Sequence, residues 1–249
     1  MANWSDPRVG AAGFGATAAG TRDAAYDTGL RSYMLSVYNR MTSAVLLTGV
    51  VAMLFSNGGS SSPAAQILMG GGPLAWIIML APLAIVFAMS FGANRMKTGT
   101  MNLLFWAFAV LMGLSLSTVF LQYTGTSIAG AFFATAAAFS ALSLYGYTTK
   151  RDLAPFGTFL IMGLVGIIVA SLINMFLQSS AMQLVISIIG VLLFAGLTAY
   201  DTQKIKSMYF EVRGTEFAGK AAIMGALSLY LDFINMFLFI LRLFGSSRN

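Results

Sequence analysis

The chain has 249 residues, of which 58% are hydrophobic and only 9% are charged. A soluble domain carries about 25% charged residues, so this composition excludes an ordinary soluble globular protein. There is no cysteine, which excludes disulfides, and no histidine, which removes the commonest metal ligand and the usual switch near neutral pH. The net charge of +6 reflects basic loops between apolar segments, and we expect no nucleic-acid partner.

The first 31 residues are rich in glycine and alanine and carry scattered charges. They lack an apolar segment long enough for a cleaved signal peptide. We therefore expect residues 1–31 to form a disordered cytoplasmic tail and residues 32–249 to form a transmembrane domain.

Seven apolar runs follow, and each is close to the length of about 20 residues that a helix needs to cross a bilayer. They cover approximately residues 33–56, 74–93, 101–121, 128–147, 156–177, 181–201 and 222–244. The sequence thus predicts an all-α membrane protein with seven transmembrane helices. Two connections are longer than the rest. Residues 57–73 are uncharged and rich in glycine and serine, which predicts a flexible loop, and residues 202–221 are polar.

Lysine and arginine alternate between the two sides of the predicted bundle. They occur in the tail and after the second, fourth and sixth runs, whereas the other three loops have none. This pattern places the N-terminus in the cytoplasm. Seven spans then put the C-terminus outside, together with Arg242 and Arg248, which the rule does not favour. A last segment that re-enters and returns to the cytoplasm would remove this conflict and remains an alternative.

An aspartate interrupts the last apolar run. Asp232 lies near the middle of that run, where a carboxylate costs roughly 2.5–3.5 kcal/mol. Gly225, Ser228, Asp232, Asn235 and Arg242 share one helical stripe. A polar stripe must face protein or water, so it predicts an ion or proton path along Ser228, Asp232 and Asn235. The alternative is a hydrogen-bonding stripe that only holds helices together.

A second aspartate, Asp201, ends the preceding apolar run, with Lys204 three residues later. If Asp201 approaches Asp232, the two titrations couple, and one proton shared between them holds the two helices together. Loss of that proton at higher pH makes the two carboxylates repel each other and separates the two helices. The alternative for Asp201 is a surface ion pair with Lys204, worth less than ~1 kcal/mol. Arg95, after the second run, is either a partner for these acids or a simple cytoplasmic anchor.

Two segments near the end of the chain carry a family resemblance. They read AYDTQKIK at residues 199–206 and SLYLDFINMFLFILRLF at residues 228–244, with weaker matches at residues 36–52 and 94–102. On these segments, residues 31–244 resemble the Bax inhibitor family, and the chain looks like a bacterial member. The resemblance implies a seven-helix fold in which the last helix is central and the other six surround it.

The resemblance also implies a function, which is a pH-sensitive calcium leak across the membrane. Asp201 and Asp232 would then form a hydrogen-bonded proton-sensing pair, and an arginine of the second helix, placed here at Arg95, would compete for Asp201 in the open pore. The two aspartates would offer calcium the carboxylate oxygens it prefers, with calcium as the transported ion and no tightly bound cofactor. Membrane lipid, protons and a membrane-anchored AAA protease are the other implied partners, and the bacterial inner membrane is the implied location.

Three other functions stay open on the sequence. Paired aspartates on adjacent membrane helices also occur in intramembrane aspartyl proteases, but the Gly-x-Gly-Asp and Pro-Ala-Leu segments that such an enzyme needs are missing here, so we do not expect an enzyme. A non-conducting regulator or substrate of the AAA protease would use the N-terminal tail. A proton-coupled transporter would show saturable, substrate-driven proton uptake.

Overall fold

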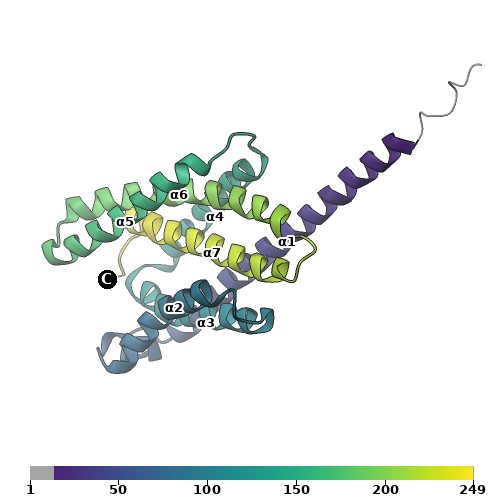
Figure 1. Cartoon of the computed structure of the whole chain (residues 1–249). Coiled ribbons are helices and arrows are strands. Elements are labelled where there is room, and N and C mark those ends of the chain that lie inside the picture. The colour runs from purple at the N-terminus through teal and green to yellow at the C-terminus, as the bar shows by residue number, and fades with distance from the viewer. Residues whose placement is uncertain (1–13, 249) are drawn as a thin grey trace, which may run out of the picture.

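Seven long α-helices make up the part of the chain that the structure describes. The structure is a computed structural model that describes the backbone of residues 14–248 and the side chains of residues 28–248. The helices are α1 (Phe14–Phe55), α2 (Pro73–Gly92), α3 (Thr98–Gln122), α4 (Gly125–Thr148), α5 (Ala154–Leu177), α6 (Ser180–Val212) and α7 (Phe217–Phe244) (Figure 1). Each contains a stretch long and apolar enough to cross a membrane. The prediction of an all-α membrane protein with seven spans is therefore confirmed.

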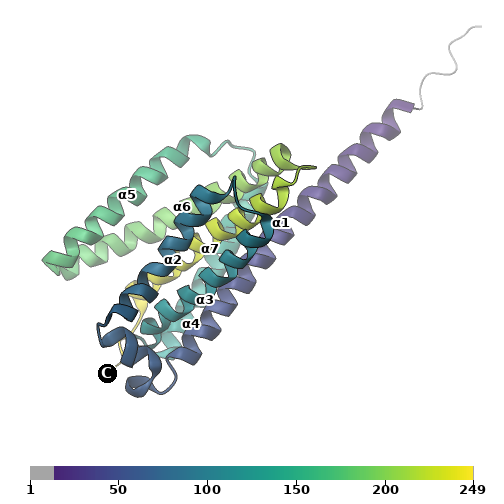
Figure 2. The same ribbon diagram turned by 60° about the horizontal axis from the view of Figure 1, so that its bottom comes forward.

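The last helix is the most buried part of the bundle. Of the most apolar stretch of α7, 72% is buried, compared with 6% for α5. Helix α7 packs against α1, α3, α4 and α6, whereas α2 lies on α3 and α5 lies on α6 (Figure 2). The expected ring of six helices is thus four neighbours of α7 and two outer helices. A helix that is apolar all round, such as α5, can face lipid on most of its surface.

Helix α1 begins at Phe14, well before the stretch that could cross a membrane, which starts at Thr28. Residues 14–31 are helical, although their composition predicted a disordered tail, and residues 1–13 of that tail lie outside the described part of the chain. The segment is rich in alanine, which is the best helix former, so a helix that starts in the bundle can continue outward. Figure 1 shows this part of α1 projecting beyond the other helices.

The connection between α1 and α2 is folded, where the sequence predicted a flexible loop. It contains a 3₁₀ turn (Gly59–Ser61) and a short π-helical turn (Ala65–Met69). Ala64 and Leu68 are buried against α2 and α3. These apolar contacts outweigh the flexibility that the many glycine and serine residues would otherwise give the segment.

The predicted polar loop of residues 202–221 shrinks to the four residues between Val212 and Phe217. Gly214 allows this tight turn because it adopts a φ of 76°, a left-handed conformation that other residues rarely tolerate. Helix α6 can continue past the apolar run because Ile205 and neighbouring apolar side chains pack into the core of the bundle. Lys204, Lys206 and Glu211 therefore lie on α6 and Lys220 lies on α7, whereas Arg213 and Glu216 lie in the turn.

The two ends of the bundle differ in charge. We call the end that carries the α2–α3, α4–α5 and α6–α7 connections the basic end, after its residues Arg95, Lys97, Lys150, Arg151, Arg213 and Lys220. Helix α7 runs without a break from the basic end to the opposite end, so the structure does not show the re-entrant alternative. At the opposite end, Arg248 donates to the carbonyl of Phe120, near the C-terminus of α3. Carbonyls at a helix C-terminus attract a cation, which gives Arg248 a local reason to lie there.

A proline interrupts the hydrogen bonding of α2. Pro82 has no N–H, so the carbonyl of Ile78 loses its helical donor. Ser115 of α3 donates from its hydroxyl to that carbonyl at 3.0 Å. The neighbouring helix thus completes the backbone hydrogen bonding of α2, as buried membrane segments require.

Candidate functional site

The two predicted gate residues lie at similar depths on neighbouring helices. Helices α6 and α7 leave one short turn in antiparallel directions. At 1.5 Å per residue, Asp201 lies about 16 Å along α6 from that turn and Asp232 lies about 22 Å along α7. Asp201 therefore does not sit at a helix end, as the apolar run suggested, but well inside α6.

The environment of Asp232 leaves one carboxylate oxygen without a donor. Its side chain is only 4% exposed, and Oδ2 has no hydrogen-bond partner in the described part of the chain. Asp201 is half-buried and close enough for its charge to act on Asp232. A buried polar atom without a partner is costly, and a proton shared between the two carboxylates would remove that cost. The structure thus places Asp201 near enough to Asp232 for the charges to interact, but among the described residues no hydrogen bond joins the two carboxyl groups.

Lys204 also acts on Asp201, by electrostatic attraction. Its side chain is exposed, and the ammonium lies 6.0 Å from the centre of the Tyr200 ring. An exposed cation is screened by water and adds little stability. Asp201 therefore lies under the electrostatic influence of both groups that the sequence allowed, the surface cation Lys204 and the buried carboxylate Asp232.

The rest of the polar stripe on α7 serves packing as much as polarity. Asn235 is half-buried, and its side-chain amide donates to the carbonyl of Leu231 on the same helix at 2.8 Å. Gly225 is buried against Ile205 of α6, where a side chain would meet close contacts. Ser228 is half-buried. Gly225 therefore lets α6 approach α7 closely, and Asp232 is the one acid of the stripe.

Helix α4 contacts α6 on both sides of Asp201. Gly146 lies directly against the backbone carbonyl of Ala199, so no side chain fits there. Thr202 donates from its hydroxyl to the hydroxyl of Ser143 at 3.3 Å. Small residues that allow close helix contact are common in membrane bundles. These contacts, which the sequence did not single out, fix the position of Asp201 relative to α4.

A hydrogen-bonded chain ties α7 to α1 and α3 two residues before Asp232. The hydroxyl of Tyr230, which is fully buried, lies 2.7 Å from the hydroxyl oxygen of Thr48. Thr48 donates its one proton to the carbonyl of Ala109 at 2.8 Å, so Tyr230 must be the donor to Thr48. The tyrosine belongs to the motif that carries the family resemblance, but only the structure shows its partner.

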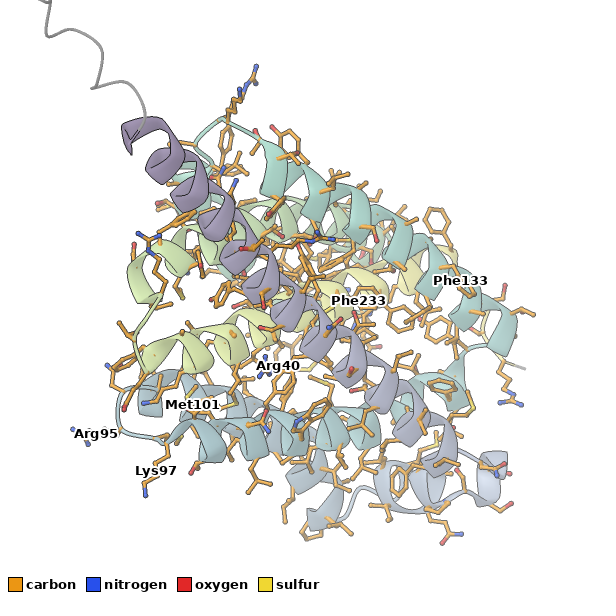
Figure 3. All side chains as sticks on the ribbon, turned by 90° about the vertical axis from the view of Figure 1, so that its right-hand side faces the viewer. Arg40, Arg95, Lys97, Met101, Phe133 and Phe233 are labelled. Carbon is orange, nitrogen blue, oxygen red and sulfur yellow. The ribbon has the colours of Figure 1, made fainter. Side chains whose placement is uncertain are left out.

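The predicted latch residue lies away from the aspartates. Arg95 is exposed in the connection that follows Gly92, beyond the end of α2, and Figure 3 shows its side chain pointing away from the bundle. A second arginine, Arg40, is half-buried on α1 and donates to the carbonyl of Ser36 at 3.3 Å. In the described part of the chain, the structure does not bring either arginine to the aspartate pair.

Among the described residues, no group of three or more histidine, cysteine, aspartate or glutamate side chains could hold a metal ion. The aspartate pair supplies at most two carboxylates, whereas calcium takes 6–8 oxygen ligands in its stable sites. The two aspartates by themselves are therefore too few for such a site.

Comparison with known proteins gives the family. The family model described as Inhibitor of apoptosis-promoting Bax1 matches residues 30–249. The uncharacterized protein RP147 of Rickettsia prowazekii is 48% identical over 229 residues, which cover 92% of this chain and 95% of that protein. The inner membrane protein YbhL of Escherichia coli is 46% identical over 222 residues, with 88% and 94% covered. An uncharacterized protein of Caulobacter vibrioides is 43% identical over 232 residues, with 91% and 93% covered. The chain therefore belongs to the Bax inhibitor family, as its last two helices indicated.

Proposed function

We propose that this protein is a pH-sensitive calcium leak channel of a bacterial inner membrane, gated by Asp201 and Asp232. One observation carries the proposal. Asp232 is buried with an oxygen that lacks a donor, and Asp201 acts on it from the neighbouring helix. Two like charges at short range repel strongly when little water separates them, so the pair has two distinct states that differ by one proton.

The sign of the pH effect follows from these two states. At low pH a proton bridges the two carboxylates and holds α6 against α7. As the pH rises the proton leaves, the two negative charges repel, and the seam between the helices opens. The freed carboxylate oxygens are the ligands that calcium prefers. Two carboxylates are too few to bind calcium tightly, so they suit an ion that passes through the membrane. Calcium flux should therefore rise with pH.

Two further features belong to this proposal. The basic end of the bundle would face the cytoplasm, which places the N-terminus there. Arg95 would compete for Asp201 only in an open state, because it is exposed in the α2–α3 connection of this structure. The name of the Escherichia coli relative, an inner membrane protein, supports the proposed location.

A second candidate function is a non-conducting regulator or substrate of a membrane-anchored AAA protease. The observation that favours it is the N-terminal part of α1, which projects beyond the bundle in Figure 1. A segment outside the packed core offers a protease a place to engage. We propose no enzymatic activity for the aspartate pair itself.

The test is calcium flux into proteoliposomes from about pH 5 to about pH 8. Wild type should show flux that rises with pH, and Asp201→Asn or Asp232→Asn should abolish that dependence. Asp152→Asn is the matched control, because Asp152 is an exposed acid in the α4–α5 connection and should leave the profile unchanged.

Absence of flux above that of empty liposomes at every pH would refute the channel. Deletion of residues 2–30 would then test the protease function. The deletion should alter degradation or protease binding and leave ion flux unchanged. A pH dependence that survives in both aspartate variants would keep the channel but remove the pair as its gate.

A further inference from the structure

A long groove runs between α1 and α4. Its larger part has a volume of about 900 Å³ and its smaller part about 310 Å³. The two parts share Val45 of α1, Phe132 of α4 and Phe233 of α7, so they form one continuous depression. Figure 3 looks onto α1 and α4, with Phe233 labelled between them. We call this feature the α1–α4 groove.

The α1–α4 groove opens sideways. Helices α1 and α4 both pack on α7 but make little contact with each other. Exposed apolar side chains, such as Leu35, Leu46 and Leu144, lie on its margins. In a bilayer the material outside such an opening is lipid hydrocarbon. Apolar walls without a partner forfeit dispersion contacts, so an apolar chain that fills the groove is stabilised there.

Charge in the groove is confined to one end. The larger part has mostly apolar walls, with Arg31 and Tyr147 at its basic end and the uncharged polar side chains of Tyr38, Thr42 and Ser140 among the walls further along. The other part has almost entirely apolar walls. Its exception is Thr48, whose hydroxyl already bonds to Ala109 and Tyr230. A ligand that matches this pattern has a polar head at the basic end and an apolar chain along the rest.

Two cations lie near this end: Arg31 lines the groove, and Lys206 contacts Tyr147, one of the lining residues. Arg31 is exposed on α1, and within the described side chains it has no carboxylate partner. Lys206 of α6 is half-buried, donates to the carbonyl of Tyr147 at 2.8 Å, and lies 5.1 Å from the centre of that ring. The acids on either side of Lys206 on α6 are Asp201, which acts electrostatically on Asp232, and the exposed Glu211, and neither lines the groove. The mouth of the groove therefore favours an anionic head.

The length of the groove fits one leaflet. From Arg31 to Val45, where the larger part meets the smaller, α1 rises by about 21 Å at 1.5 Å per residue. Half of a bilayer, with its headgroup region, is about 20–22 Å thick. A phospholipid with its head beside Arg31 would therefore place one acyl chain along the larger part and its methyl end near Phe233.

We infer that the α1–α4 groove is a binding site for an anionic phospholipid of the leaflet at the basic end. Arg31 holds the phosphate, with Lys206 as the second cation. The walls contributed by α1, α4 and α7 hold one acyl chain. A groove that binds any lipid would not distinguish an anionic headgroup from a neutral one. A groove that binds a second copy of the chain would be covered in a dimer.

Native mass spectrometry of the full chain in detergent tests this inference. The probes are phosphatidylglycerol and phosphatidylcholine with the same acyl chains. Wild type should retain phosphatidylglycerol in preference, and Arg31→Gln should lower that preference by about fivefold, which is the effect of one juxtamembrane cation. Lys97→Gln is the matched control, because Lys97 is an exposed cation of the same end that lies on the α2–α3 connection, outside the groove.

A second pair of variants tests the chain-binding part. Ala136→Trp places an indole in the groove and should lower retention of both lipids, whereas Ala137→Trp adds the same side chain at an exposed neighbouring position outside it. Equal retention of both lipids by wild type overturns the inference. So does retention that Ala136→Trp leaves unchanged, or a dimer that this variant dissociates.

Discussion

The hydrogen-bonded chain from Tyr230 through Thr48 to Ala109 makes a sharp prediction about stability. Thr48→Val keeps the shape of the side chain but removes its hydroxyl, so the buried hydroxyl of Tyr230 loses its acceptor. Tyr230→Phe removes the donor, and Thr48 can still donate to Ala109. The two single variants therefore differ in what they leave behind, although they break the same bond.

The difference can be given a magnitude. Loss of one hydrogen bond that leaves no buried polar group unpaired costs about 1 kcal/mol, and the average contribution of an interhelical hydrogen bond in a membrane protein is about 0.6 kcal/mol. A buried hydroxyl without a partner adds about 1–3 kcal/mol. We expect Tyr230→Phe to lower the free energy of unfolding by about 1 kcal/mol and Thr48→Val by about 2–3 kcal/mol. The double variant has no orphaned hydroxyl, so it should be more stable than Thr48→Val alone.

The assay is reversible unfolding of the purified protein in mixed micelles, followed by circular dichroism and analysed as a double-mutant cycle. The wild-type chain in the same micelles is the reference. Thr42→Val is the matched control for the loss of a threonine hydroxyl, because Thr42 is exposed on the same helix. Additive effects of Thr48→Val and Tyr230→Phe would refute the reasoning, because two groups that share one bond cannot lose it twice.

Two further predictions concern the packing around α2 and α4. Ser115→Ala removes the donor to the Ile78 carbonyl, so it should cost about 1 kcal/mol and speed amide hydrogen exchange in α2; unchanged exchange would show that α2 does not need this bond. Gly146→Leu should force α4 away from α6, because the carbonyl of Ala199 lies where the new side chain begins. This substitution should lower the free energy of unfolding by about 1–3 kcal/mol. Gly130→Leu, on the same helix with nothing within 4 Å, should have little effect, and equal losses would contradict the steric argument.

The fold class and the burial of Asp232 could be predicted because both depend on local features of the sequence. A run of about 20 apolar residues needs to be a membrane helix whatever its neighbours are. A carboxylate in such a run, such as Asp232, has to face the interior for the same energetic reason. Neither inference requires knowledge of which helices are adjacent, whereas the approach of Asp201 to Asp232 depends on the packing of α6 against α7.

The connections were predicted poorly because tertiary contacts decided them. Residues 202–212 look like a polar loop, but Ile205 is buried, and its packing extends α6 by three turns. Residues 57–73 look flexible, but Leu68 is buried against the ends of α2 and α3. In both segments, a few apolar side chains with distant partners outweigh the local composition, and no pattern within the segment reveals those partners.

The surroundings of the site also needed the structure. The sequence placed Arg95 at the end of a helix, which leaves its direction open, and the structure shows it exposed in a connection. The link between Ser115 and Ile78 joins residues far apart in the chain, so Pro82 alone could only indicate a missing bond. The α1–α4 groove depends on the distance between two helices, which composition does not determine.

The groove and the aspartate pair meet on adjacent residues of α7. Asp232 faces α6, and Phe233, about 100° further around the helix, forms part of the groove floor. Phe233 packs edge-to-face on Phe132 and Phe139 of α4, with ring centres 5.6 Å and 5.5 Å apart. A rotation of α7 that separates Asp232 from Asp201 must therefore move Phe233 against α4 and change the shape of the groove. Any ligand that fits the groove better in one state must stabilise that state of the pair, because the coupling between two sites is reciprocal.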